Sequence, residues 1–124
     1  MGYRTSVDGE ITIQPPLTWR EFKDSPFAAD DLDVKLRVEA ETVDTDEGPL
    51  MRKTAPALVP SWGEAYKAYN LVAHVQQAID AFPGHTFTGR LDCEGEENGD
   101  LWRVVVRNGR AEKITPRIVW PDED

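Results

Sequence analysis

The sequence holds little of the chemistry on which most enzymes and metalloproteins rely. Its 124 residues include one cysteine, Cys93, and two histidines, His74 and His85. A lone cysteine excludes an internal disulfide and any zinc site built from several cysteines, and it suits a reducing cytoplasm. The sequence also lacks a phosphate-binding glycine loop, zinc-ligand spacing and a nucleophile elbow. It therefore predicts no catalytic residues and no cofactor.

Long apolar runs and an excess of positive charge are missing as well. No stretch approaches the ~20 apolar residues of a membrane-spanning helix, and the first residues lack a signal-peptide pattern. Acidic residues outnumber basic ones by 23 to 14, which gives a formal net charge of −9. This balance disfavours direct binding to nucleic acid or to an anionic membrane. We expect a cytoplasmic protein whose partner is a protein with a basic surface.

What the sequence does contain is typical of a globular chain. Hydrophobic residues make up 40% and charged residues 30% of the composition, which lies outside the disordered range. A chain of this size buries roughly two-thirds of its unfolded surface. Length and composition therefore predict one domain that covers residues 1–124.

The periodicity of apolar residues predicts six strands. They are expected over residues 7–14, 32–41, 50–58, 87–94, 102–107 and 110–114, and residues 118–120 could extend the last one. Alternation is clearest in the second, where Leu32, Val34, Leu36, Val38 and Ala40 would face the core. Pro56 cannot donate to a strand ladder, so it indicates an edge strand over residues 50–58.

Two capping boxes predict where helices begin. Thr18 and Glu21 open a helix of little more than one turn, and Ser61 and Glu64 open a long helix that reaches Phe82. The predicted order is β-α-β-β-α-β-β-β. We therefore expect an α+β fold, in which one long helix packs on one face of an antiparallel sheet. Its first six elements follow a ferredoxin-like order, with an added C-terminal hairpin.

The candidate site is the acidic segment, residues 92–102, which reads Asp92-Cys93-Glu94-Gly95-Glu96-Glu97-Asn98-Gly99-Asp100-Leu101-Trp102. Its five carboxylates repel one another unless a cation, a basic surface or water compensates the charge. As a plain hairpin, the segment pairs Glu94 with Leu101, Cys93 with Trp102, and Asp92 with Arg103. Asp92 and Arg103 would then form a cross-strand ion pair on the outer face.

Two functional interpretations stand beside the plain hairpin. Oxygen ligands from Glu94, Glu96, Glu97 and Asp100 could hold a divalent cation, although the spacing is not that of an EF-hand. With His85 as a base, such a site would make a small metal-dependent hydrolase. The leading interpretation is docking onto a basic protein surface, with Trp102 as an anchor. The predicted binding residues are Asp92, Glu94, Glu96, Glu97, Asp100 and Trp102.

A second hairpin carries the opposite charge. Asn108-Gly109 predicts a two-residue turn that pairs Arg107 with Arg110. These two side chains would then share one face with Arg103. The three arginines could bind a phosphate or carboxylate, or they could form a solvated outer face partly neutralised by Asp92 and Glu112.

Three segments carry a resemblance to a known family: Met1-Gly2-Tyr3-Arg4-Thr5, Gly9-Glu10-Ile11-Thr12-Ile13-Gln14-Pro15-Pro16-Leu17-Thr18-Trp19, and Glu94-Gly95-Glu96-Glu97-Asn98-Gly99-Asp100-Leu101-Trp102 continuing to Asn108-Gly109. They resemble a family of small uncharacterised proteins found in actinobacteria and bacteriophages. The resemblance implies no catalytic or binding residue. It implies a bacterial or phage cytoplasmic protein. Together with the charge layout, it predicts a non-enzymatic protein-binding or regulatory module.

Overall fold

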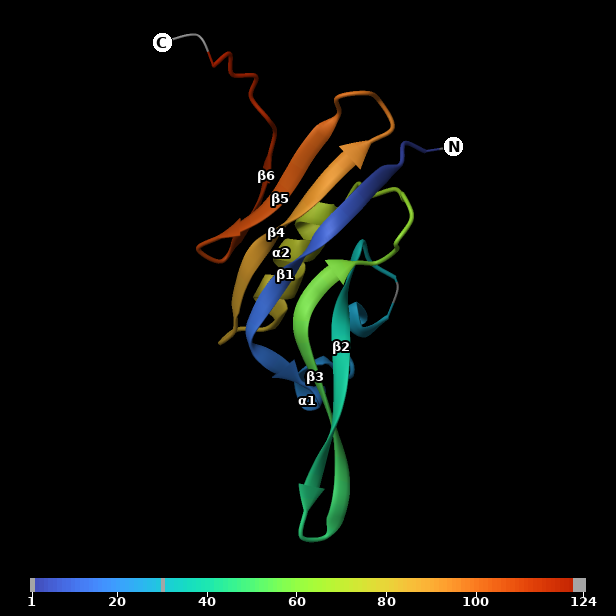
Figure 1. Cartoon of the computed structure of the whole chain (residues 1–124), viewed down its shortest axis with the longest axis vertical. Helices are drawn as coiled ribbons and strands as arrows, with labels where there is room; N and C mark the ends of the chain where they lie inside the picture. Colours follow the sequence, from blue (N-terminus) through green and yellow to red (C-terminus); the bar gives the residue numbers. More distant parts are fainter. Residues whose placement is uncertain (1, 30, 122–124) are drawn as a thin grey trace.

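A single antiparallel sheet runs through the computed structural model, which describes residues 2–29 and 31–121. The strand order is β2-β3-β1-β4-β5-β6 (Figure 1). The strands are β1 (Thr5–Thr18), β2 (Val34–Thr45), β3 (Gly48–Pro60), β4 (Thr86–Gly95), β5 (Leu101–Arg107) and β6 (Arg110–Ile114). The helices are α1 (Trp19–Phe22), the 3₁₀ helix η1 (Pro26–Ala28) and α2 (Leu71–Ala81).

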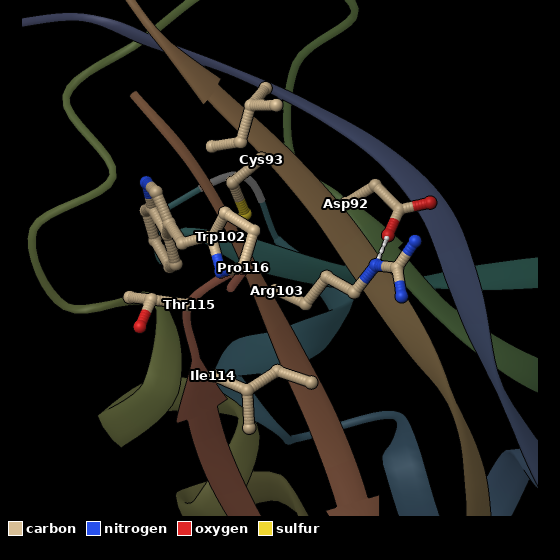
Figure 2. Close-up of a pocket in the computed structure, with 8 residues that line it drawn as sticks. Asp92, Cys93, Trp102, Arg103, Ile114, Thr115 and Pro116 are labelled. Carbon is tan, nitrogen blue, oxygen red and sulfur yellow. Dashed lines mark hydrogen bonds and ion pairs between the residues drawn. The ribbon is translucent and has the colours of Figure 1, made fainter. Parts of the chain in front are cut away.

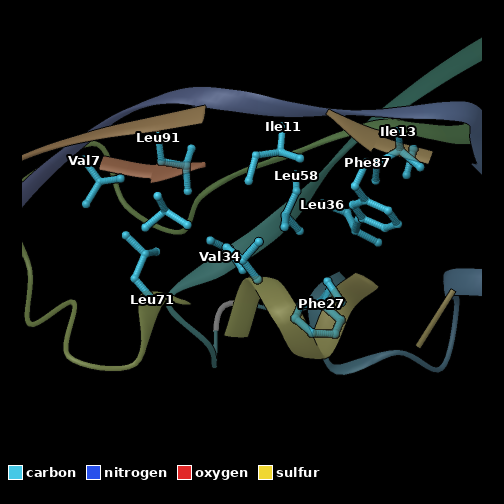
Figure 3. Packing of buried hydrophobic residues seen from close by; sticks show 14 of the residues in the cluster. Val7, Ile11, Ile13, Phe27, Val34, Leu36, Leu58, Leu71, Phe87 and Leu91 are labelled. Atoms are coloured by element: carbon cyan, nitrogen blue, oxygen red, sulfur yellow. The ribbon is translucent and has the colours of Figure 1, made fainter. Parts of the chain in front are cut away.

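The core lies on one face of this sheet. Figure 3 shows α2 and η1 on the same side of the strands, with apolar side chains from both layers in between. The central strand β1 supplies every second residue, because alternate side chains of a strand point to the same face. Its buried residues pack with those of α2 and η1, and the set includes Val7, Ile11, Ile13, Phe27, Val34, Leu58, Leu71 and Leu91.

The predicted registers of the two late hairpins are confirmed. β4 and β5 pair Glu94 with Leu101 and Asp92 with Arg103, while β5 and β6 pair Arg107 with Arg110. Asn108 and Gly109 have φ angles of 51° and 77°, the positive values that a tight two-residue turn requires. β6 is the last strand of the sheet, and it contacts α2. The Gln76 side chain of α2 accepts a 2.8 Å hydrogen bond from the Ala111 N–H.

The predicted α+β fold class is wrong. The described part of the chain is mostly antiparallel sheet, with 52% of its residues in strands and 15% in helices. A ferredoxin-like arrangement needs two full helices over the sheet, whereas α1 has 4 residues and α2 has 11.

The long predicted helix fails over residues 61–70 because its backbone has other partners. The Ser61 hydroxyl donates to the Leu32 carbonyl instead of capping a helix. Tyr66 exchanges two backbone hydrogen bonds with Thr5, of 2.8 and 3.0 Å. These contacts hold the segment against β1, and the helix begins only after Asn70.

The prediction of an edge strand at Pro56 is also wrong, because β3 lies between β2 and β1. Pro56 falls where both ladders change register. The β2 pairing moves from Arg37↔Ala57 to Glu39↔Thr54, and the β1 pairing also shifts beyond Ala57. A proline at such an irregularity removes no ladder hydrogen bond.

Beyond this irregularity, β2 and β3 continue as a two-stranded ribbon, here called the hairpin arm (residues 39–54). It runs from Glu39↔Thr54 to Thr45↔Gly48 and projects from the body of the protein (Figure 1). Val38 and Ala40 were predicted to face the core, but both are exposed because the ribbon leaves the core at this point.

The last strand ends at Ile114, and residues 115–121 leave the sheet without regular secondary structure. The predicted extension of this strand over residues 118–120 is therefore wrong. Pro116 explains the departure, since it has no N–H to offer β5. Among the described residues, no helix is both long and apolar enough to cross a membrane.

Candidate functional site

The acidic segment begins with a carboxylate that is already paired. Asp92 accepts a 2.7 Å hydrogen bond from Arg103 Nε across the β4–β5 ladder, and Arg90 Nε lies 3.6 Å from the same oxygen. The predicted cross-strand ion pair is confirmed. Two guanidinium groups therefore compensate the charge of Asp92 within the sheet.

The loop that follows is bound by the first residues of the chain. The Tyr3 hydroxyl donates to Asp100 Oδ2 and accepts from the Glu97 N–H at 3.1 Å. The Arg4 N–H donates to Glu96 Oε1 at 3.0 Å. The hydrogen bond to the Asp100 carboxylate raises the pKa of Tyr3 above its usual value. No sequence spacing could reveal this clamp, because its partners lie more than 90 positions apart.

The acidic segment does not gather the ligands that a cation site needs. Within residues 2–29 and 31–121, no group of three or more His, Cys, Asp or Glu side chains could hold a metal ion. His85, the base of the hydrolase interpretation, precedes β4, whereas the acidic loop follows it. The ten residues of β4 span roughly 30 Å, so the structure does not bring His85 to the loop.

Cys93 and Trp102 lie at the end of the sheet beside the departing residues 115–116. They line a cavity of about 320 Å³ together with Arg103 and Pro116 (Figure 2). Burial raises the pKa of the Cys93 thiol to about 12, which makes it a poor nucleophile. Trp102 is half-buried, and Lys113 Nζ lies 4.7 Å from its ring centroid. The predicted anchor therefore has contacts within the chain.

A second surface, which sequence analysis did not single out, lies between α1 and the hairpin arm. Its apolar side chains are unusually open to solvent: Trp19 is 47%, Leu50 60% and Met51 65% exposed. They border a groove of about 580 Å³. We call it the arm groove, and its lining residues are Thr18, Trp19, Arg20, Val43, Leu50, Met51, Arg52, Lys53 and Thr54.

The arm groove has a fixed aromatic wall and a basic rim. The Trp19 ring packs edge-on against buried Phe22, with centroids 5.4 Å apart, and Lys53 Nζ lies 5.2 Å from its centroid. Arg52 is paired with Glu41, which offsets part of the positive charge. The residues that line the groove therefore join exposed apolar surface to net positive charge, whereas the tip of the same arm is acidic through Asp44, Asp46 and Glu47.

Comparison with known proteins places the chain in a family. The model of a family of unknown function, DUF6205, matches residues 1–124. The chain belongs to the DUF6205 family. No curated protein and no solved structure matches it. The match to DUF6205 spans both the acidic segment and the arm groove, and the family description assigns an activity to neither.

One signal in this DUF6205 sequence could have pointed to the arm groove. Leu50 and Met51 are adjacent large apolar residues, and because alternate residues of a strand share a face, at most one of them can belong to the core. The periodicity of the segment indicated a strand but could not show that the strand projects beyond the other layer.

Proposed function

We propose that this DUF6205 protein is a protein-binding module, and that its arm groove holds a partner segment with apolar side chains next to carboxylates. The observation that carries the proposal is the exposure of Trp19, Leu50 and Met51 around one groove. Burial of apolar area contributes roughly 25 cal/mol per Å². Contiguous exposed apolar surface rimmed by polar residues is typical of interaction sites.

The position of the groove supports this proposal. A two-stranded ribbon is marginally stable in water without a further layer, and the hairpin arm extends past the strands that could cover it. A partner that packs along the groove would supply that layer. The groove lies beside α1, whose Trp19 is already oriented by Phe22. Little side-chain freedom is therefore lost at this contact when a partner binds.

The rim defines the chemistry of the partner. Arg20, Arg52 and Lys53 line the groove together with the apolar residues, and Glu41 pairs with Arg52. Carboxylates beside the apolar side chains of a partner would meet these cations. Complementary charge of this kind speeds association and selects between partners. Aromatic and arginine side chains in the centre of an interface often contribute most to its affinity.

The acidic segment remains a second candidate surface. The prediction that Asp92, Glu94, Glu96, Glu97, Asp100 and Trp102 dock a basic partner stays a prediction. Asp92, Glu96 and Asp100 have contacts within the chain, so Glu94 and Glu97 are the residues on which this interpretation depends most. A regulatory role in a bacterial or phage setting is part of the proposal and is not required for binding at the arm groove.

Short synthetic peptides test the proposed function directly. One set joins large apolar residues to aspartate and glutamate, and a matched set joins the same apolar residues to lysine. We expect the acidic set to bind in a fluorescence anisotropy titration and the basic set to bind more weakly. Met51→Glu should weaken binding roughly tenfold or more, because it removes apolar contact and adds a like charge.

The matched control is Val38→Glu, an exposed position next to the arm that does not line the groove. It should bind the acidic peptides as the unchanged protein does. Circular dichroism should show that both variants keep the sheet. If neither peptide set binds, or if Met51→Glu binds as well as Val38→Glu, the proposed function is wrong.

A further inference from the structure

We infer that the arm groove receives residues 117–124 of a second copy of this chain. The inference rests on the proposed function, because it names the partner of the same groove. Four observations lead to it: an exposed apolar triplet, the charges beside that triplet, the distance to the chain's own groove, and the presence of both surfaces on every copy.

The apolar triplet is Ile118-Val119-Trp120. These side chains are 87%, 73% and 65% exposed, and they follow the end of β6 in a segment without regular secondary structure. Each contributes hydrophobic free energy only when another surface covers it. An extended segment with three adjacent large apolar residues is thus suited to packing against an apolar groove.

The charges of this segment complement those of the groove. The triplet is preceded by Arg117 and followed by Pro121, Asp122, Glu123 and Asp124, so residues 117–124 carry a net charge of −2. The groove places Trp19, Leu50 and Met51 next to Arg20, Arg52 and Lys53. Apolar residues joined to carboxylates therefore match apolar residues joined to cations, which is the partner chemistry already argued for the groove.

The apolar triplet of the segment cannot reach the groove of its own copy. Ile114 pairs with Arg103, which pairs with Asp92, which pairs with Asp8 of β1. Thr18, at the groove, lies ten residues further along β1, or roughly 33 Å at 3.3 Å per residue. The six residues from Ile114 to Trp120 span at most about 20 Å.

The arrangement in Figure 1 agrees with this estimate. The segment leaves the sheet at one end of the molecule, and the hairpin arm projects at the other. Each copy thus presents one groove and one segment at opposite ends. When two copies bind each other, the segment of one covers the groove of the other. If both copies exchange segments in this way, they form a closed two-fold dimer.

Sedimentation equilibrium of the full chain over a wide concentration range is the first test. We expect the mean mass to rise with concentration. Ile118→Ser combined with Trp120→Ser removes the segment's apolar side chains, and Met51→Glu alters the groove. Each should weaken self-association roughly tenfold or more. Val38→Glu should associate like the unchanged chain.

Mixing the two weakened variants is the decisive test. The segment variant keeps an intact groove, and the groove variant keeps an intact segment. A one-to-one mixture should therefore form a mixed complex through one remaining contact, more strongly than either variant associates alone. A chain that stays monomeric throughout, variants that associate unchanged, or a mixture without a complex would each overturn the inference.

A labelled peptide of residues 116–124 separates this inference from the function on which it rests. It should bind the arm groove and lose affinity with Met51→Glu. If other acidic-apolar peptides bind the groove and this one does not, the second copy is not the partner and the protein-binding function stands. If no such peptide binds, both proposals are wrong.

Discussion

His85 and Glu21 are joined by a 2.6 Å contact between the imidazole Nε2 and the carboxylate Oε2. The other ring nitrogen, Nδ1, lies 2.6 Å from the Pro15 carbonyl oxygen. Both partners are acceptors, so both hydrogen bonds form together only when both ring nitrogens carry a proton, that is, when the imidazole is positively charged. Glu21 also accepts a 3.0 Å hydrogen bond from the Thr18 N–H. The pair thus ties α1, the wall of the arm groove, to the residue that precedes β4.

This ion pair predicts a pH window for stability. Burial lowers the pKa of His85, but the bonds to Pro15 and Glu21 outweigh it, so the pKa is raised above its usual 6.5. The Thr18 N–H and His85 lower the pKa of Glu21 below 4.5. The histidine's contribution is complete below 6.5 and is lost as pH rises through its raised pKa. The glutamate's contribution is present above 4.5 and is lost as pH falls through its lowered pKa.

The measurement is urea unfolding across pH for the unchanged protein and for His85→Gln. The difference in the free energy of unfolding should be greatest between about pH 4.5 and 6.5 and should shrink on the alkaline side. Glu21→Gln should reproduce most of that difference, and the double variant should add little to either single one. Parallel stability curves at every pH would show that the pair contributes no stability.

Two glycines allow β1 and β4 to approach each other. Gly9 and Gly89 have φ angles of 109° and 128°. A Cβ atom on Gly89 would lie 2.7 Å from the Glu10 carbonyl oxygen, and one on Gly9 would lie 2.7 Å from the Arg90 carbonyl oxygen. Gly89→Ala should therefore destabilise the fold by about 3 kcal/mol. The Glu10 backbone must move away from the new Cβ atom, and residue 89 must also adopt a φ that alanine disfavours.

Gly48 offers the matched control, since its φ of 113° is similar but an added Cβ would meet nothing within 4 Å. Gly48→Ala should cost only the conformational term of about 1 kcal/mol. Denaturant unfolding of both variants separates the close approach from the positive φ. Equal losses would mean that the contact with the Glu10 carbonyl contributes nothing.

The late hairpins could be predicted from sequence because their signals are local. Asn108-Gly109 specifies a tight turn, and the alternation from Asp92 to Arg103 favours the register that puts Cys93 and Trp102 on the core face. The Thr18–Glu21 contact at the start of α1 likewise lies within three residues. In each case the partners are near neighbours along the chain or across one turn.

The features that sequence analysis missed depend on distant partners. The Ser61–Glu64 pattern predicts a helix, but Thr5 competes for the Tyr66 backbone from 61 positions away. Tyr3 and Asp100, which are joined by a hydrogen bond, lie even further apart in the sequence, at 97 positions. Alternation over the second strand placed Val38 in the core, yet whether a face is covered depends on where the other layer ends. The arm groove was missed for this reason.

The Tyr3 clamp predicts a local effect on the acidic loop. Tyr3→Phe removes both the donor to Asp100 and the acceptor for the Glu97 N–H while keeping the ring. Amide hydrogen exchange should become faster at Glu97 and its neighbours in the loop, with little change in the β5–β6 hairpin. Tyr69→Phe is a useful comparison, because the Tyr69 hydroxyl accepts from the Tyr3 N–H and its removal leaves the Tyr3 hydroxyl in place. Unchanged exchange at Glu97 would mean that the loop holds its conformation without Tyr3.

Adding metal ions separates the two functional interpretations of the acidic segment, a divalent-cation site and a docking surface for a basic protein. Thermal melts with calcium, magnesium, manganese or zinc, each against excess chelator, should show no saturable, ion-specific rise in Tm. The reason is that Asp92, Glu96 and Asp100 already have partners, and the described residues hold no cluster of three or more suitable ligands. A Tm that rises with the concentration of one ion would instead show that the ion binds the folded state. If Glu94→Gln combined with Glu97→Gln then abolished the rise, the cation would belong to this loop, and assays for metal-dependent hydrolysis would follow.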